Sequence, residues 1–352
     1  MKKIKLITFI LLIVSFIIVL FYSIFGTQLS FLSVNEIKEN RKLKQDLITE
    51  LKINNLNTVY DKTNNIYYYM VSVDYENNMY VLNLELDKQL KYKIIDETLN
   101  IVRINYKKPI KIIIYNDKYY YETKIQLTNL PLVSISTEEK ISENDTETVF
   151  NYINCEYSNK IISNNSKMHV RGTTSSWYDK KGYKMNFYDK EFNKEKKLKI
   201  SNFYYGDSLI LDAVYRDPSK IRNVLATQLW NDISSSFTNV NMYSEFVEVF
   251  INNEYIGLYV LTEPVNRTNL NLNKSSDKNT SIVLKSQDWV FVTSKSKIND
   301  INDDTYMNYE LKYPNDASLY SKSWKKILGK LSKYYDEYTD SSYDIVSSTF
   351  NI

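Results

Sequence analysis

Short runs in which apolar and polar residues alternate recur through this chain, and they constrain its fold more than any other feature. Successive side chains of a β-strand point to opposite faces, so the alternation indicates strands with one buried and one solvent-facing side. Between about 57 and 135 the runs are separated by Asn-Asn and Asn-Asp turns, and Asn116-Asp117 joins two of them as a hairpin. We therefore expect a small β-rich domain over 57–128, without a cluster of reactive side chains.

The N-terminus differs from this pattern, because lysines precede a long apolar run from 6 to 25. A helix of about twenty residues spans roughly 30 Å, the thickness of the hydrocarbon core of a bilayer. Since flanking lysines stay on the cytoplasmic side, the sequence predicts an anchored chain with its N-terminus inside and its body outside the cytoplasm. Residues 1–30 are expected to be this membrane anchor, or a signal segment, and 31–56 a polar helical linker.

Composition excludes several classes of function. The formal net charge is only +3, with acidic and basic residues interleaved, which argues against a nucleic-acid partner. Cys155 is the only cysteine, so no intramolecular disulfide can form. His169 is the only histidine, which excludes zinc sites built on clusters of His and Cys. A single histidine in a strand-like stretch is more often structural than catalytic.

The stretch from 168 to 187 combines an Arg-Gly pair, four consecutive hydroxyl residues and a Lys-Lys-Gly-Tyr-Lys run. Alternation on both sides of it places Arg171 and Lys184 on the polar faces of two strands. Backbone N–H groups, hydroxyls, the guanidinium fork and ammonium groups all bind phosphate oxygens. The stretch is therefore either a cradle for the phosphates of a nucleotide or a solvated hairpin with ordinary surface lysines. The candidate residues are Arg171, Thr173, Thr174, Ser175, Ser176, Lys180, Lys181 and Lys184.

A helix is expected over 218–233, because Asp217 suits an N-cap and Pro218 the first helical position. Its apolar residues recur at helical spacing and should face the core; they are Ile221, Val224, Leu225 and Leu229. A hairpin with its turn at Asn252-Asn253 follows, and Glu263-Pro264 ends its second strand. The stretch 136–148 is polar and acidic, and we interpret it as a linker or long surface loop.

Four blocks stand in a fixed order: RGTTSSW (171–177), KKGYK (180–184), DPSKIRN (217–223) and NNEYIGLYVLTE (252–263). In this order they resemble the CotH family of atypical spore-coat protein kinases. The resemblance covers 129–352, and LPLVSIST (130–137) is similar to the usual entry into that domain.

The resemblance implies an ATP-dependent Ser/Thr protein kinase with ATP and Mg²⁺ as cofactors and a serine-rich coat or surface protein as substrate. It implies that Arg171, Lys181 and Lys184 face the phosphates and that Arg222 holds the lobe together. The segment YVLTEPV, which contains Glu263, would be the crossover beside the adenine. The expected fold class is α+β, with an N-terminal transmembrane helix and a small β-rich domain. A kinase-like domain follows over 129–352, with a nucleotide-binding β-rich lobe and the start of a helical lobe.

Phosphoryl transfer also requires carboxylates that orient the acceptor hydroxyl and hold the metal ion. No aspartate between 264 and 352 stands in the context of the family's Asn-x-Asp-like or Trp-Asp-x-Asp-like element, so no catalytic or metal-binding residue is assigned. We expect either an anchored kinase whose remaining lobe lies beyond Ile352, or a non-catalytic (truncated or pseudokinase) binding or structural protein of the surface or coat. A carbohydrate enzyme using Asp303-Asp304, or Glu245 with Glu248, is the least favoured alternative.

Overall fold

A computed structural model describes residues 32–43, 50–72, 78–95, 100–172, 174–202, 204–234 and 241–267, with shorter pieces between 270 and 314. The chain divides into two compact units. The first contains 1–207, 211–215 and 246–260, and the second contains 208–210, 216–245 and 261–352.

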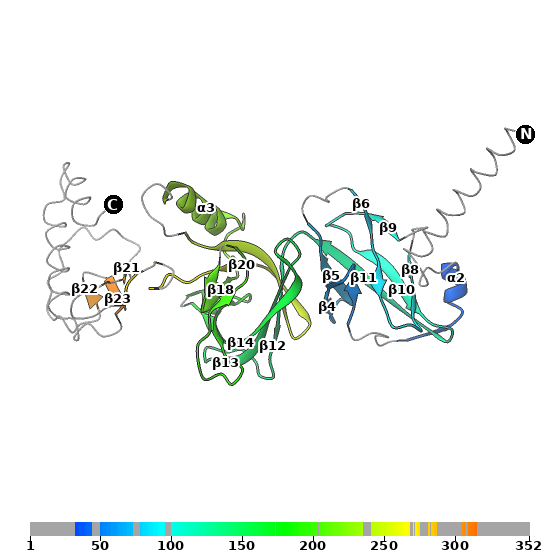
Figure 1. Cartoon of the computed structure of the whole chain (residues 1–352), viewed down its shortest axis with the longest axis horizontal. Helices are drawn as coiled ribbons and strands as arrows, with labels where there is room; N and C mark the ends of the chain where they lie inside the picture. Colours follow the sequence, from blue (N-terminus) through cyan, green and yellow to red (C-terminus); the bar gives the residue numbers. More distant parts are fainter. Residues whose placement is uncertain are drawn as a thin grey trace, which may run out of the picture. The chain divides into compact units, whose positions relative to one another are not determined.

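The N-terminal part of the first unit is built on a six-stranded sheet (Figure 1). Its order is β4 (Val59–Asp61), β5 (Ile66–Met70), β11 (Tyr119–Thr128), β10 (Ile110–Tyr115) and β8 (Lys91–Ile94), and β1 (Arg41–Lys42) pairs with β11. Smaller sheets join β2 (Lys52–Ile53), β3 (Leu56–Asn57) and β7 (Leu84–Glu85), and β6 (Met79–Val81) with β9 (Ile101–Arg103). The alternation produces a core on one face, where Ile112, Ile114 and Ile125 are completely buried.

The polar segment before this sheet is helical for one turn only, in α2 (Val34–Ile37). Ser33 and Glu36 cap the turn reciprocally, and Ile37 packs against Ile113, Tyr115 and Tyr120 on the second face of the sheet. The chain then enters β1, which pairs with β11. The sequence predicted a polar helical linker over 31–56. In the described part of that range the pairing of β1 with the distant strand β11 outweighs the local preference for a helix.

Seven strands close into a barrel in the order β12 (Leu132–Ser136), β13 (Thr146–Asn154), β14 (Ser158–Arg171), β15 (Gly182–Tyr188), β18 (Ser208–Asp212), β20 (Glu254–Thr262) and β19 (Ser244–Ile251). Phe150, Met168, Met185 and Phe187 from β13, β14 and β15 are completely buried. The polar stretch from 137 to 145 connects β12 to β13, so it is a loop of the barrel. A short ribbon joins β16 (Leu198–Lys199) to β17 (Tyr205–Gly206).

The predicted α+β class is wrong, because the described chain is mostly β and seven of its strands form this closed barrel. Helices in the described ranges are α2, the 3-10 turn η2 (Thr174–Trp177) and α3 (Arg222–Ser234). Closing the barrel gives the outermost strands partners and leaves no open sheet edge for helices to cover. The barrel closes through the pairing of β12 with β19, which are more than a hundred residues apart in the sequence. Alternation of apolar and polar residues identifies strands but does not show which distant strands pair.

The predicted transmembrane helix and the single-pass, extracytoplasmic location inferred from it are not supported. Within the described ranges no helix is long and apolar enough to cross a membrane; α2 has 4 residues and α3 has 13. A spanning helix needs about twenty. Residues 6–25, on which the prediction was based, lie outside the described residues.

In the second unit, α3 begins four residues later than predicted. The Asp217 carboxylate accepts hydrogen bonds from the N–H groups of Ser219 and Arg222, both at 3.0 Å, and the chain between them forms a turn. Lys220 in this turn has a φ of 63°, which a helix does not allow. The predicted buried face is also only partly correct, since Val224 is buried while three others are about half exposed: Ile221, Leu225 and Leu229. This unit also contains the sheet of β21 (Val283–Ser286), β23 (Tyr309–Tyr313) and β22 (Thr305–Tyr306).

Candidate functional site

The strand pair β14–β15 places the charged residues of the 168–187 stretch on one face. Met168 pairs with Met185, and both are completely buried. His169 pairs with Lys184, and Arg171 with Gly182, so their side chains point away from the barrel interior. The prediction that Arg171 and Lys184 share a face is therefore confirmed by the register of the two strands.

Between these strands the structure describes Gly172 and the 3-10 turn η2 at 174–177, which together we call the hydroxyl turn. Gly172 has a φ of 103°, and a Cβ at this position would lie 1.9 Å from Ser175 Oγ. Only glycine fits this backbone and this contact. After it, η2 exposes Thr174 and Ser175, and Ser176 is half-buried. Thr173, also predicted to bind phosphate, lies outside the described residues.

The lysines that follow the turn have different surroundings. Lys181 Nζ donates to Ser176 O at 2.8 Å and so holds the end of the hydroxyl turn. Lys180 Nζ donates to Ala213 O at 3.2 Å and to Leu258 O, and it lies 4.2 Å from the centre of the Tyr259 ring. The Lys180 ammonium is thus stabilised by backbone carbonyls and an aromatic face.

Gly257 lies next to Lys180 and has a backbone conformation that favours glycine. It has a φ of 110°, and a Cβ built on it would be 3.6 Å from Lys180 Nζ. The neighbouring Tyr259 hydroxyl donates to Lys181 O at 3.0 Å, and burial raises the pKa of this phenol well above its usual value. A half-buried lysine, two glycines with positive φ and a neutral tyrosine therefore fix the base of the β14–β15 connection.

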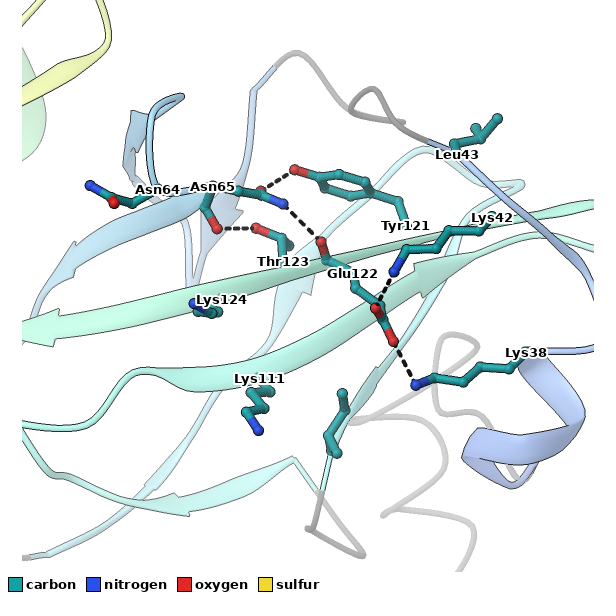
Figure 2. Close-up of a pocket in the computed structure, with 11 residues that line it drawn as sticks. Lys38, Lys42, Leu43, Asn64, Asn65, Lys111, Tyr121, Glu122, Thr123 and Lys124 are labelled. Carbon is teal, nitrogen blue, oxygen red and sulfur yellow. Dashed lines mark hydrogen bonds and ion pairs between the residues drawn. The ribbon is translucent and has the colours of Figure 1, made fainter.

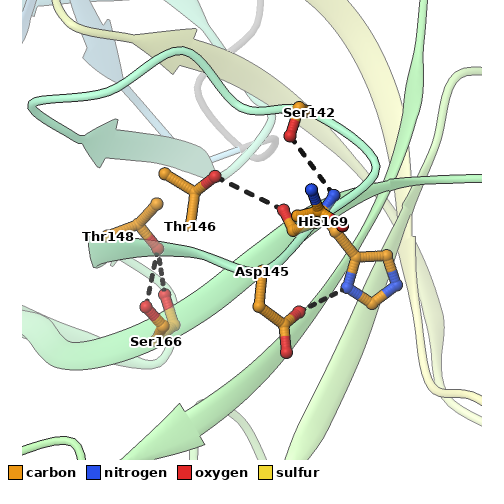
Figure 3. Close-up of polar contacts among 7 residues, drawn as sticks. Ser142, Asp145, Thr146, Thr148, Ser166 and His169 are labelled. Carbon is orange, nitrogen blue, oxygen red and sulfur yellow. Dashed lines mark hydrogen bonds and ion pairs between the residues drawn. The ribbon is translucent and has the colours of Figure 1, made fainter.

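A hydrogen-bonded histidine–aspartate pair that the sequence did not predict lies on the same face of β14 (Figure 3). His169 Nδ1 lies 2.7 Å from Asp145 Oδ1, with 26% and 48% of the two side chains exposed. The Val170 N–H donates to Ser142 O at 2.6 Å and holds the Asp145 loop against the strand. Asp145 was part of the stretch interpreted as a linker or loop, and nothing local in that stretch signals a partner 24 residues away.

Figure 3 also shows two buried hydroxyl groups that lie close together, those of Thr148 and Ser166. Thr148 and Ser166 are 2% and 1% exposed, and their hydroxyl oxygens are 2.6 Å apart. The Thr148 hydroxyl lies within hydrogen-bond distance of Ser166 O as well, at 3.0 Å. These groups satisfy one another, so they contribute to the cohesion of the strand pair β13–β14.

Arg222 and Glu263, the other predicted site residues, belong to the second unit. Arg222 is 75% exposed, and its Nε lies 3.4 Å from Asp217 Oδ1. The Ser219 hydroxyl and the backbone N–H groups lower the pKa of Asp217 below its usual value, and Arg222 adds to this effect. Glu263 Oε1 accepts the Tyr243 N–H at 2.8 Å. Both residues have local structural contacts in this unit.

The carboxylates considered for a carbohydrate enzyme also have local partners. Glu245 accepts a hydrogen bond from Tyr243, and Glu248 from Tyr255. Burial raises the pKa of Glu248 above its usual value. Asp303-Asp304 lies outside the described residues. Over the described ranges, no group of three or more His, Cys, Asp and Glu side chains is placed to hold a metal ion.

Chemically, the face of β14–β15 offers a planar guanidinium, an ammonium and a turn rich in hydroxyls, all carried by well-anchored backbone. Guanidinium, ammonium and hydroxyl groups are donors whose hydrogen bonds an anion with several oxygens can accept.

Comparison with known protein families identifies the family of this chain. The model of the family described as CotH kinase protein matches residues 168–352, more than half of the 352-residue chain. The match begins at the end of β14 and includes the hydroxyl turn, α3 and the β19–β20 hairpin. Comparison with curated proteins gives no match. The chain belongs to the CotH kinase protein family.

Proposed function

We propose that this CotH-family chain binds ATP on the outer face of β14 and β15 and acts as a Ser/Thr protein kinase on a serine-rich coat or surface protein. One observation carries the proposal: Arg171 and Lys184 share this face and flank a turn that is rich in hydroxyl groups. Gly172 has a backbone that only glycine tolerates there, so the turn is fixed before a ligand binds.

Each residue has a distinct role in this proposal. Arg171 presents two parallel N–H donors to phosphate oxygens, and Lys184 supplies a mobile positive charge. The exposed hydroxyls of Thr174 and Ser175 donate to the same oxygens. Lys181 holds the turn through Ser176 O, and Lys180 supports its base. Bound ATP with Mg²⁺ would supply the phosphoryl group that a kinase transfers.

A non-catalytic surface or coat binding protein is the second candidate. Between 264 and 352 the sequence has no Trp-Asp-x-Asp-like element, and no aspartate there is assigned a catalytic role. A protein of this kind would keep the phosphate-binding face and use it for recognition.

Nucleotide affinity tests the site. Isothermal titration of the full chain with ATP and Mg²⁺ compares Lys184→Ala, on β15, with Lys160→Ala, which removes the same charge from an exposed position on the neighbouring strand β14. Lys184→Ala should weaken ATP binding roughly tenfold, as expected for the loss of one charge-assisted contact. Lys160→Ala should bind ATP like the unchanged chain. Equal affinities in all three proteins would overturn the assignment.

Transfer of the γ-phosphate separates the two candidates. The full chain is incubated with labelled ATP, Mg²⁺ and a serine-rich peptide, and with the same peptide in which alanine replaces serine. Labelling that requires serine and falls in Lys184→Ala supports the kinase. ATP binding without transfer supports the non-catalytic candidate.

A further inference from the structure

The six-stranded sheet of the first unit carries a pocket of about 610 Å³ formed by residues other than those of the ATP site (Figure 2). Four lysines line it, one from α2's C-terminal end, one from β1 and two from the sheet itself: Lys38, Lys42, Lys111 and Lys124. Glu122 is the only acidic residue in the lining. We call this the lysine pocket. Four positive charges and one negative charge give its wall a net charge of +3.

Lys111 and Lys124 are directly opposite each other on the antiparallel strands β10 and β11. Side chains at such positions lie close enough that like charges destabilise the sheet. Within the described residues neither lysine has an ion-pair partner, and Lys124 is half-buried. This pair is therefore an unfavourable arrangement that an anion between the two ammonium groups would relieve.

The other two lysines share one carboxylate. Lys38 Nζ lies 2.7 Å from Glu122 Oε1, and Lys42 Nζ lies 2.6 Å from Glu122 Oε2. Figure 2 shows Glu122 between them, with Lys111 on the neighbouring strand. Glu122 lies two residues before Lys124, on the same face of β11, and it holds Lys38 and Lys42 on the side of the pocket next to the opposed pair.

Uncharged polar residues of the pocket wall hydrogen-bond to one another or to the backbone. The Asn65 amide donates to Glu122 O at 2.9 Å, its oxygen accepts from the Tyr121 hydroxyl, and the Thr123 hydroxyl donates to Asn65 O at 3.1 Å. These hydrogen bonds fix the shape of the pocket, so the ammonium groups remain as its recognition elements.

We propose that the lysine pocket binds a multiply charged phosphate-type oxyanion, either free or carried on a serine side chain. A phosphate-type group offers several oxygens to ammonium donors and neutralises the opposed pair. The volume is within the range of small-ligand sites and exceeds what a single monovalent ion needs. This site is independent of the ATP site, and it gives a role to a domain whose sequence shows no clustered chemistry.

Titration with pyrophosphate tests the proposal. All proteins are full-length and carry Lys184→Ala, so that the proposed ATP site contributes little to the binding signal. The double variant Lys111→Gln/Lys124→Gln is compared with Lys107→Gln/Lys108→Gln, which removes the same charge from exposed positions of the same domain outside the pocket. Sodium chloride at matched ionic strength measures general screening.

The dissociation constant for pyrophosphate should rise roughly tenfold or more in the pocket variant and stay unchanged in the control variant. Without anion, the pocket variant should melt at a higher temperature than its parent, because the opposed charges are gone. Pyrophosphate affinity equal in the pocket variant and its parent overturns the proposal. If the double variant does not fold, Lys111→Gln alone provides the same comparison.

A serine-containing peptide, phosphorylated or not, identifies the source of the oxyanion. Tighter binding of the phosphorylated peptide than of pyrophosphate, lost in the pocket variant, assigns a phosphorylated side chain. Tighter binding of pyrophosphate assigns a free oxyanion. Binding of either probe that the pocket substitutions do not change counts against the site.

Discussion

Two basic regions of the first unit use lysine in opposite ways. At the β14–β15 connection, Lys180 and Lys181 are satisfied by backbone carbonyls and hold the chain in place. In the lysine pocket, Lys111 and Lys124 face each other across two strands, and neither has an acidic partner among the residues that the structure describes. The first arrangement stabilises a conformation, whereas the second stores a repulsion that a ligand can remove.

The comparison shows why a count of lysines does not locate an anion site. The 168–187 stretch attracts attention because its charges are close in sequence, yet two of its lysines have structural contacts of their own. The lysine pocket draws on positions between 38 and 124, and no stretch of the sequence displays it. Four substitutions test the contrast.

Lys180→Met should have the largest effect. It removes an ammonium group that donates to Ala213 O and Leu258 O, at a cost of about 1.5–3 kcal/mol in the free energy of unfolding. Urea denaturation measures the loss. Lys181→Met is the matched control, because within the described residues the Lys181 ammonium donates to a single carbonyl, that of Ser176. Equal losses in the two variants would contradict the structural role of Lys180.

Gly172→Ala comes next. A Cβ there collides with Ser175 Oγ, and the φ of 103° strains any other residue, so we expect a loss of about 1–3 kcal/mol in stability. ATP affinity should fall as well, because the hydroxyl turn must rearrange. Gly182→Ala is the control, since its nearest contact from a Cβ would be 3.4 Å, to Leu211 O. An unchanged stability of Gly172→Ala would show that the turn is not fixed.

Glu122→Gln tests the acid side of the lysine pocket. Hydrogen bonds from Lys38 and Lys42 hold the pKa of Glu122 below its ordinary value of 4.5. A carboxyl group whose pKa is lower in the folded than in the unfolded chain stabilises the folded state when the pH is above the unfolded-state pKa. This stability is lost as the pH falls through the folded-state pKa. The unchanged chain should lose about 0.5–1 kcal/mol more than Glu122→Gln on acidification from about pH 6 to below the folded pKa.

Denaturant unfolding measured across that pH range checks this difference. Glu39→Gln, in the same exposed segment, should keep the pH dependence of the unchanged chain. The same slope in Glu122→Gln would show that its ion pairs contribute nothing to stability.

Lys111→Gln should have the smallest effect and the opposite sign. Removing one of two opposed like charges should raise the free energy of unfolding by about 0.2–1 kcal/mol at low ionic strength. The gain should shrink in high salt, which screens the repulsion. Lys107→Gln should change stability little. A destabilised Lys111→Gln would mean that this lysine has a favourable partner and would weaken the contrast between the two regions.

Much of the local structure follows from the sequence. Both predicted hairpin turns are present, with Asn116 between β10 and β11, and Asn252 and Asn253 at φ of 50° and 61° between β19 and β20. Asparagine tolerates this left-handed backbone, which is why these turns can be recognised from residues alone. The helix start was misplaced by four residues, because Asp217 caps a turn before α3 as well as the first N–H of the helix.

By itself the sequence determined the strands, their turns, the shared face of Arg171 and Lys184, and membership of the CotH family, because alternation and turn chemistry act between neighbours in the chain. Tertiary structure alone decided the closure of the barrel, the pairing of His169 with Asp145 and the opposition of Lys111 to Lys124. These depend on which distant strands pair and in which register. Register follows from the burial of whole faces against one another, and a shift of one residue would turn every such side chain to the other face.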